Sequence, residues 1–288
     1  MRDHGEFKFV TRRKKGASHV RTNYDSSISS LPDDDENDNY SNVNYETVFR
    51  KVLEAEVELK NSLFADNVFY YLRDSLSALN VSGISNILCY GLGHFSYRRS
   101  SKYQLALLLS LKKHYNSKVH VYDPVFSSKE IKLLKGLDCN IIQVNEEGKH
   151  LVHNNVTLIY MPHCPTHLIN NFLYANWSRK LNKCILLTNS FSVVVDDLKK
   201  VNRSTSVDYI SRIRSYATEI PLRNSFTCEE AFNDISIHIF LKQDVDTIPE
   251  SFWNKREEPC YRDEEIDYLT AKQTEGVDAK NSRTKDET

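Results

Sequence analysis

The stretch ISNILCYGLGHFS, residues 84–96, decides the fold. It begins with an apolar run of strand length, and Gly91 and Gly93 follow this run in the sequence GLG. Glycine allows a sharp turn of the chain and a close approach of the backbone to a ligand. A strand, such a turn and then a helix are typical of a Rossmann-like α/β domain. The turn departs from the GxGxxG pattern, because Ser96 occupies the position of the third glycine.

Strand-like and helix-like segments alternate beyond this turn. Short apolar runs predict strands, and apolar residues at helical spacing predict the helices between them. The strands are predicted at 84–90, 119–122, 140–144, 156–161 and 184–188, and the helices at 101–115, after Ser127, after Pro165 and at 209–216. Two later runs, 219–223 and 235–241, predict further strands. This order indicates a Rossmann-like three-layer sandwich with a mostly parallel sheet and an antiparallel C-terminal edge.

The flanking segments differ from this α/β core, which we place at residues 82–254. Residues 41–81 carry two stretches of helical periodicity, which predict an N-terminal helical extension packed on the sheet, with Asp66 as the cap of its second helix. Residues 1–40 and 255–288 are polar and charged, and we expect both to be disordered tails, because they offer little apolar surface to bury.

Composition favours a soluble protein inside the cell. The net charge is −1, so no overall charge attracts nucleic acid or membrane. The six cysteines form no CxxC pair, which suits reduced thiols of the cytoplasm or nucleus. No signal sequence and no apolar run of about 20 residues is present. The basic run Arg12–Lys15 is either a nuclear import signal or a solvated charge cluster. We therefore expect a protein of the cytoplasm, and also of the nucleus, that binds other proteins and does not bind nucleic acid directly.

Polar residues follow the predicted strands, and the carboxyl ends of parallel strands are where open α/β sheets bind ligands. These residues are Gly91, Gly93, His94 and Ser96 after the first strand, Asp123 after the second, Glu146 after the third, His163 and Cys164 after the fourth, and Asn189 and Ser190 after the fifth. We expect them to form one ligand-binding site. The pattern assigns no catalytic residue and no metal site.

The glycine turn and Asp123 each allow two interpretations. The turn, followed by a helix N-terminus, can hold the anion of a nucleotide-like ligand, or it can be a tight turn without a ligand. Asp123 can accept hydrogen bonds from ribose hydroxyls, or it can end its strand and open a turn with Pro124.

Three residues near the fourth strand, His163, Cys164 and His167, have side chains that can bind zinc or haem iron. The dipeptide Cys164-Pro165 is similar to short haem-regulatory motifs. The alternative is a capped helix start with a buried thiol. Nucleophilic catalysis has less support, because Ser96 and Ser190 lie in no GxSxG elbow.

Several segments together resemble the SRR-like proteins (sensitivity to red light reduced). The matching segments are GLGHFS at 91–96, YQLALLL at 103–109, VYDPVFSSKE at 121–130, NEEGKH at 145–150, YMPHC at 160–164, NNFLYANW at 170–177 and LLTNSF at 186–191. They occur in the same order and spacing over residues 84–192. No one of these motifs is diagnostic alone; their register makes the resemblance specific.

The resemblance implies a regulatory role. Plant members act in light input to the circadian clock, animal members are linked to haem biosynthesis and clock gene expression, and a yeast relative to microtubule-related processes. The main hypothesis is therefore a non-catalytic regulator that binds a ligand or a protein. The alternative is a Rossmann-like transferase that uses a nucleotide or S-adenosylmethionine. Against S-adenosylmethionine, Cys89 and Tyr90 occupy the place where Rossmann-type methyltransferases carry an acidic residue before the turn.

Overall fold

The computed structural model describes residues 44–200 and 208–261. The predicted tail 1–40, with its basic run, and residues 262–288 lie outside these ranges. Residues 255–261, which the sequence pattern assigned to a tail, are described and contact the domain. Glu257 N donates to Tyr209 Oη at 2.9 Å, and Tyr261 Oη donates to Asn171 Oδ1 at 2.7 Å.

Seven strands of the described chain form one sheet, in the order β3-β2-β1-β4-β5-β7-β6. They are β1 (Asn86–Tyr90), β2 (Lys118–Tyr122), β3 (Asn140–Ile141), β4 (Thr157–Met161), β5 (Cys184–Asn189), β6 (Thr218–Pro221) and β7 (Ile235–Ile239). The strands β1 to β5 are parallel to one another, whereas β7 is antiparallel to both β5 and β6. The mostly parallel sheet and its antiparallel C-terminal edge are confirmed.

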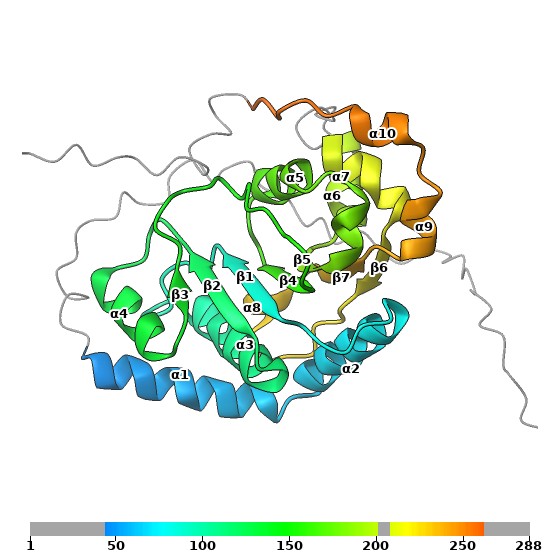
Figure 1. The fold of residues 1–288 in the computed structure, drawn as a ribbon. Helices are drawn as coiled ribbons and strands as arrows, with labels where there is room; N and C mark the ends of the chain where they lie inside the picture. Colours follow the sequence, from blue (N-terminus) through cyan, green and yellow to red (C-terminus); the bar gives the residue numbers. More distant parts are fainter. Residues whose placement is uncertain (1–43, 201–207, 262–288) are drawn as a thin grey trace, which may run out of the picture. The chain divides into compact units, whose positions relative to one another are not determined.

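Helices cover both faces of this sheet. One face packs against α1 (Tyr45–Lys60), α2 (Leu63–Ala78), α3 (Arg99–Tyr115), α4 (Ser128–Gly136) and α8 (Glu229–Phe232). The other packs against α5 (Thr166–Ala175), α6 (Phe191–Lys200), α7 (Asp208–Ile213), α9 (Lys242–Asp246) and α10 (Glu250–Asn254), with 3-10 turns at Arg179–Lys183 and Arg214–Tyr216. Figure 1 shows α1 and α3 on one side of the strands and α5 and α7 on the other, which confirms three layers.

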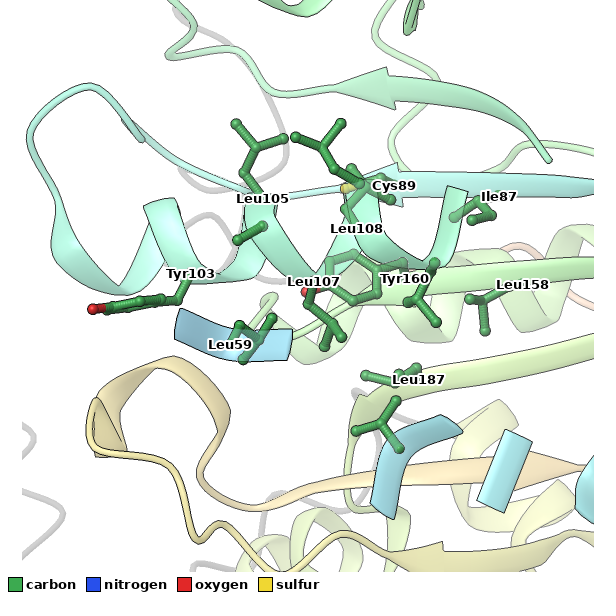
Figure 2. Packing of buried hydrophobic residues seen from close by; sticks show 14 of the residues in the cluster. Leu59, Ile87, Cys89, Tyr103, Leu105, Leu107, Leu108, Leu158, Tyr160 and Leu187 are labelled. Carbon is green, nitrogen blue, oxygen red and sulfur yellow. The ribbon is translucent and has the colours of Figure 1, made fainter. Parts of the chain in front are cut away.

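Two buried clusters follow from the period of two along each strand. In β1, Ile87 and Cys89 belong to the cluster under α3, whereas Leu88 and Tyr90 belong to the opposite cluster. Figure 2 shows Leu107 and Leu108 of α3 close to Tyr160 of the sheet. The hydroxyl of Tyr160 donates to the α3 backbone at Gln104 O, 2.8 Å away. The buried hydroxyl of Tyr160 therefore has a hydrogen-bond partner inside the core.

The N-terminal extension forms the two expected helices, but the predicted cap of the second is wrong. The cap is Ser62, whose Oγ accepts a hydrogen bond from Ala65 N at 3.1 Å. The helix begins earlier than expected, so Asp66 lies in its first turn, where a carboxylate still favours the helix dipole. By contrast, Ser127 does cap α4, in a reciprocal capping box with Glu130.

The connection from β3 to β4 contains no helix, and Figure 1 shows it as a loop. The predicted strand 140–144 is too long: pairing with β2 ends at Ile141, and the chain then leaves the sheet. We call residues 142–156 the crossover segment. Of the helices in the described ranges, none combines the length and the hydropathy that crossing a membrane requires.

Candidate functional site

The carboxyl ends of β2, β1, β4 and β5 lie side by side, because these strands are adjacent and parallel. The sequence-predicted residues that follow them are therefore placed along one edge of the sheet. Their hydrogen bonds divide them into two groups. One surrounds the glycine turn, and the other surrounds the ends of β4 and β5.

The glycine turn is held by Asp123. Both Gly91 and Gly93 have positive φ, 71° and 65°, a conformation that other residues adopt at a cost. Gly93 N donates to Asp123 Oδ2 at 2.7 Å, and Val125 N donates to Asp123 Oδ1 at 3.0 Å. Burial raises the pKa of Asp123 although these two hydrogen bonds oppose the rise. The backbone donor that a bound anion would need at Gly93 already has a partner within the protein.

A second carboxylate, Glu130 of α4, holds the rest of the turn. Glu130 is 1% exposed, and it accepts hydrogen bonds from Ser96 N at 3.0 Å, Ser127 N at 2.9 Å and His94 Nδ1 at 3.1 Å. Burial alone would raise the pKa of Glu130, but these hydrogen bonds outweigh it and the pKa is lowered. Sequence reasoning did not select Glu130 as a site residue. The spacing SSKE at 127–130, a capping-box pattern, was the signal that could have done so.

Cys164 connects the glycine turn with the end of β4. Its Sγ donates to Tyr90 O at 3.1 Å, and an added Cβ at Gly91 would overlap this sulfur. Burial raises the pKa of Cys164, so the thiol stays protonated. His167, three residues later in the sequence, packs its ring edge-on against the ring of Tyr261. Within the described ranges, no group of three or more His, Cys, Asp or Glu side chains is arranged to hold a metal.

The end of β4 is fixed by an asparagine of β5. Asn189 Oδ1 accepts from His163 N at 2.8 Å, and Asn189 Nδ2 donates to Cys164 O at 2.9 Å. His163 has a positive φ of 59°, a conformation that is uncommon for a residue with a Cβ and that these bonds help to hold. The His163 side chain is exposed. Asn189 therefore acts on the backbone of its neighbours.

Ser190 belongs to a buried polar cluster at the start of α6. Its Oγ donates to Glu219 Oε1 at 2.5 Å, and Ser192 donates its hydroxyl to Glu219 Oε2 at 2.6 Å. Burial opposes ionisation, but contact with His238 and the two serine hydroxyls outweigh it and lower the pKa of Glu219. His238 is fully buried, and its Nε2 accepts from Phe191 N at 3.3 Å. Ser190 thus bonds a carboxylate and has no histidine as its base.

Glu146 has other partners. It accepts a hydrogen bond from Tyr90 Oη at 2.9 Å and from His150 Nδ1 at 2.7 Å. The Tyr90 ring belongs to the core on the α5 side of the sheet, so this network lies on that face. The structure therefore does not join Glu146 by a hydrogen bond to the glycine-turn group.

Two asparagines of α5 hold the crossover segment. Asn171 Nδ2 donates to Glu147 O at 2.9 Å, while Asn176 donates to His150 O and accepts from Val152 N, each at 2.8 Å. A Cβ at Gly148, which has φ of 78°, would lie 2.6 Å from Leu168 O of α5. The segments NEEGKH and NNFLYANW are thus two sides of one contact, which the sequence alone did not reveal.

Comparison with known proteins gives a family and two weak structural likenesses. The SRR1 domain model matches residues 39–239. An SRR1-like protein of Drosophila melanogaster is 33% identical over 175 residues, 60% of this chain and 61% of that protein. An SRR1-like protein of Mus musculus is 38% identical over 130 residues, 44% and 52% of the two chains. The Arabidopsis thaliana protein SENSITIVITY TO RED LIGHT REDUCED 1 is 30% identical over 163 residues, 54% and 58%.

Among solved structures, a mutant of MtNAS has a TM-score of 0.37 at 13% identity, over 71% of this chain and 73% of that one. The mitomycin 7-O-methyltransferase MmcR has a TM-score of 0.30 at 12% identity, over 67% and 66%. The chain spans between about half and three fifths of the length of the three curated relatives. Because the family model covers well over half of the chain, as the matching segments led us to expect, the chain belongs to the SRR1 domain family.

Proposed function

We propose that this protein is a regulator that acts by binding a ligand or a protein partner, and not by catalysing a reaction. The observation that carries this proposal is that polar groups at the carboxyl ends of the strands are hydrogen-bonded to partners within the protein. Gly93 N is bonded to Asp123, Ser96 N to Glu130, and Ser190 Oγ to Glu219. A catalytic site needs a nucleophile or base that can reach the substrate.

The nucleophilic side chains support the same conclusion. Cys164 is buried, donates to a backbone carbonyl and keeps its proton, whereas a reactive cysteine is a thiolate with access to solvent. No serine or cysteine of the described ranges hydrogen-bonds a histidine, which is the usual activating arrangement.

Family membership suggests which process is regulated. The name of the Arabidopsis relative links that protein to red-light sensitivity, which favours a role in light signalling for this chain. The resemblance adds circadian-clock input and haem biosynthesis as the processes to examine, in the cytoplasm or the nucleus. The activity of the whole relatives reaches this chain only as a proposal, because the matches cover just part of their length.

The second candidate is a Rossmann-like enzyme, and the position of Asp123 favours it. Asp123 directly follows β2 beside the glycine turn, where dinucleotide-binding domains place the acidic residue that holds ribose hydroxyls. Nucleotide binding at this edge would require the ligand to displace or share the hydrogen bond between Gly93 and Asp123.

One experiment separates the two candidates. The thermal stability of the full chain is measured with S-adenosylmethionine, NAD, ATP and haemin, and each compound is then recovered and analysed. A compound at about 100 times its dissociation constant stabilises the protein by about 2.7 kcal/mol. Stabilisation with the compound recovered unchanged supports a binding regulator, and chemical conversion contradicts it.

Variants then locate the binding. Asp123→Asn should remove stabilisation by a nucleotide, and the matched control Asp138→Asn, at a side chain that is 96% exposed, should not. For haemin, a shift that survives Cys164→Ala would exclude this cysteine as the ligand. Absence of any shift with the three nucleotide compounds would leave the enzyme candidate without support.

A further inference from the structure

A cavity of about 160 Å³ lies on a different part of the domain from the strand-end site. It is bounded by the first residues of β1, by β2 and by the crossover segment. The residues that line it with polar side chains include Asn86, His120, His150, His153 and Asn155. Between β3 and β4 the chain forms a loop and no helix, and residues of this loop line the cavity together with residues of the sheet.

One of these histidines is oriented by a carboxylate. His150 Nδ1 lies 2.7 Å from Glu146 Oε2, and Glu146 in turn accepts from Tyr90 Oη at 2.9 Å. A carboxylate only accepts hydrogen bonds, so the proton of neutral His150 is on Nδ1. Its other nitrogen, Nε2, is then an acceptor. Within the described ranges only Nδ1 of this ring is hydrogen-bonded, and the side chain is 33% exposed, so a small molecule can reach it.

The backbone on which His150 stands is also fixed. Its carbonyl accepts from Asn176 Nδ2 at 2.8 Å, and Val152 N donates to the same asparagine at 2.8 Å. A ring held by a carboxylate, on a backbone held by a helix, presents its free nitrogen in one direction. Such preorganisation is typical of residues that bind a ligand.

The remaining lining sets the size and the character of the ligand. Leu88, Leu151 and Val152 give the cavity an apolar part beside its imidazoles and amides. A cavity of about 150 Å³ accommodates one benzene ring. His120, desolvated by the sheet and near His150, has a lowered pKa, so it adds a neutral ring at neutral pH.

We propose that this cavity is a binding site for a single-ring molecule that carries a hydrogen-bond donor, and that the donor binds to His150 Nε2. The apolar ring lies against Leu88 and Val152, and Glu146 keeps His150 in the accepting tautomer. This site is independent of the strand-end proposal, because it uses neither the glycine turn nor Asp123. It gives the protein a place for a small regulatory ligand that the family match does not assign.

Phenol is the probe, and benzene, which has the same ring without the hydroxyl, is the matched control. Binding to the full chain is measured by titration, and the imidazole signals of His120 and His150 are followed by NMR. Because benzene offers no donor to Nε2, it should bind about tenfold more weakly than phenol. Equal binding of the two compounds overturns the proposal, as does phenol binding that leaves both imidazole signals unchanged.

Two variants test the assigned roles. His150→Phe and Glu146→Gln should each abolish the preference for phenol over benzene, the first by removing the acceptor and the second by releasing its tautomer. His114→Phe, at an exposed histidine outside this cavity, should retain the preference. A preference that survives His150→Phe in a folded variant contradicts the proposal. The wild-type comparison of phenol with benzene decides the case even where a variant does not fold.

Discussion

The glycine turn and the crossover segment are both irregular stretches held by a carboxylate, but they use it differently. At the turn, Asp123 and Glu130 accept from the backbone of Gly93 and Ser96, which leaves these donors engaged. In the crossover segment, Glu146 accepts from a side chain, His150, whose second nitrogen stays free. A carboxylate thus occupies the backbone donors of the glycine turn, whereas in the crossover segment it orients an imidazole whose other nitrogen can bind a ligand.

The largest expected effect comes from removing the carboxylate that closes the turn. Glu130→Ala leaves Ser96 N and Ser127 N without their partner in a buried place and should lower the free energy of unfolding by about 4 kcal/mol. Urea unfolding measures this value, with exposed Asp138→Asn as the control near zero. A cost as small as that of the control would mean that Glu130 does not hold the turn.

The turn also depends on the missing side chain at Gly91. Gly91→Ala places a Cβ at positive φ and against Cys164 Sγ, which should cost about 3 kcal/mol. Gly83→Ala is the matched control, because no atom lies within 4 Å of its added Cβ. Combining Gly91→Ala with Cys164→Ala should recover part of the loss, and strict additivity of the two changes would speak against this contact.

Releasing the crossover segment should cost less and act locally. Asn176→Ala removes the partners of His150 O and Val152 N and should lower stability by about 2 kcal/mol. Hydrogen exchange should quicken at Val152 and not at Gly93, if the two regions are held independently. Faster exchange at both amides would show that the turn and the crossover segment are coupled.

The smallest expected effect is a pH dependence of stability at Glu219, a carboxylate that, like Asp123 and Glu130, is already hydrogen-bonded within the protein. Its pKa is lowered from the ordinary value of 4.5, so its stabilisation is complete above that value and is lost as the pH falls through the folded-state pKa. Glu219→Gln should therefore cost about 1 kcal/mol more at neutral pH than at about pH 3. Urea midpoints at the two pH values measure this difference; a cost independent of pH would mean that ionisation of Glu219 contributes nothing.

The strand-end residues show how far a pattern of residues predicts a site. The sequence placed Asp123, His163 and Asn189 at one edge, because the carboxyl ends of parallel strands meet at the same edge of a sheet. It could not show that Asn189 bonds the backbone of His163, or that Glu130 reaches Ser96, since these partners are 26 and 34 residues apart. Such pairings depend on how neighbouring loops fold over the sheet.

The sequence by itself determined the alternation of strands and helices, the glycine turn, the antiparallel edge and the family, because periodicity and local motifs are written in consecutive residues. Tertiary structure alone decided that the crossover from β3 to β4 has no helix, that α5 holds it with Asn171 and Asn176, and that a cavity forms beneath it. Hydrogen bonds between distant segments and the space left between them arise only when the chain is packed, so no local pattern encodes them.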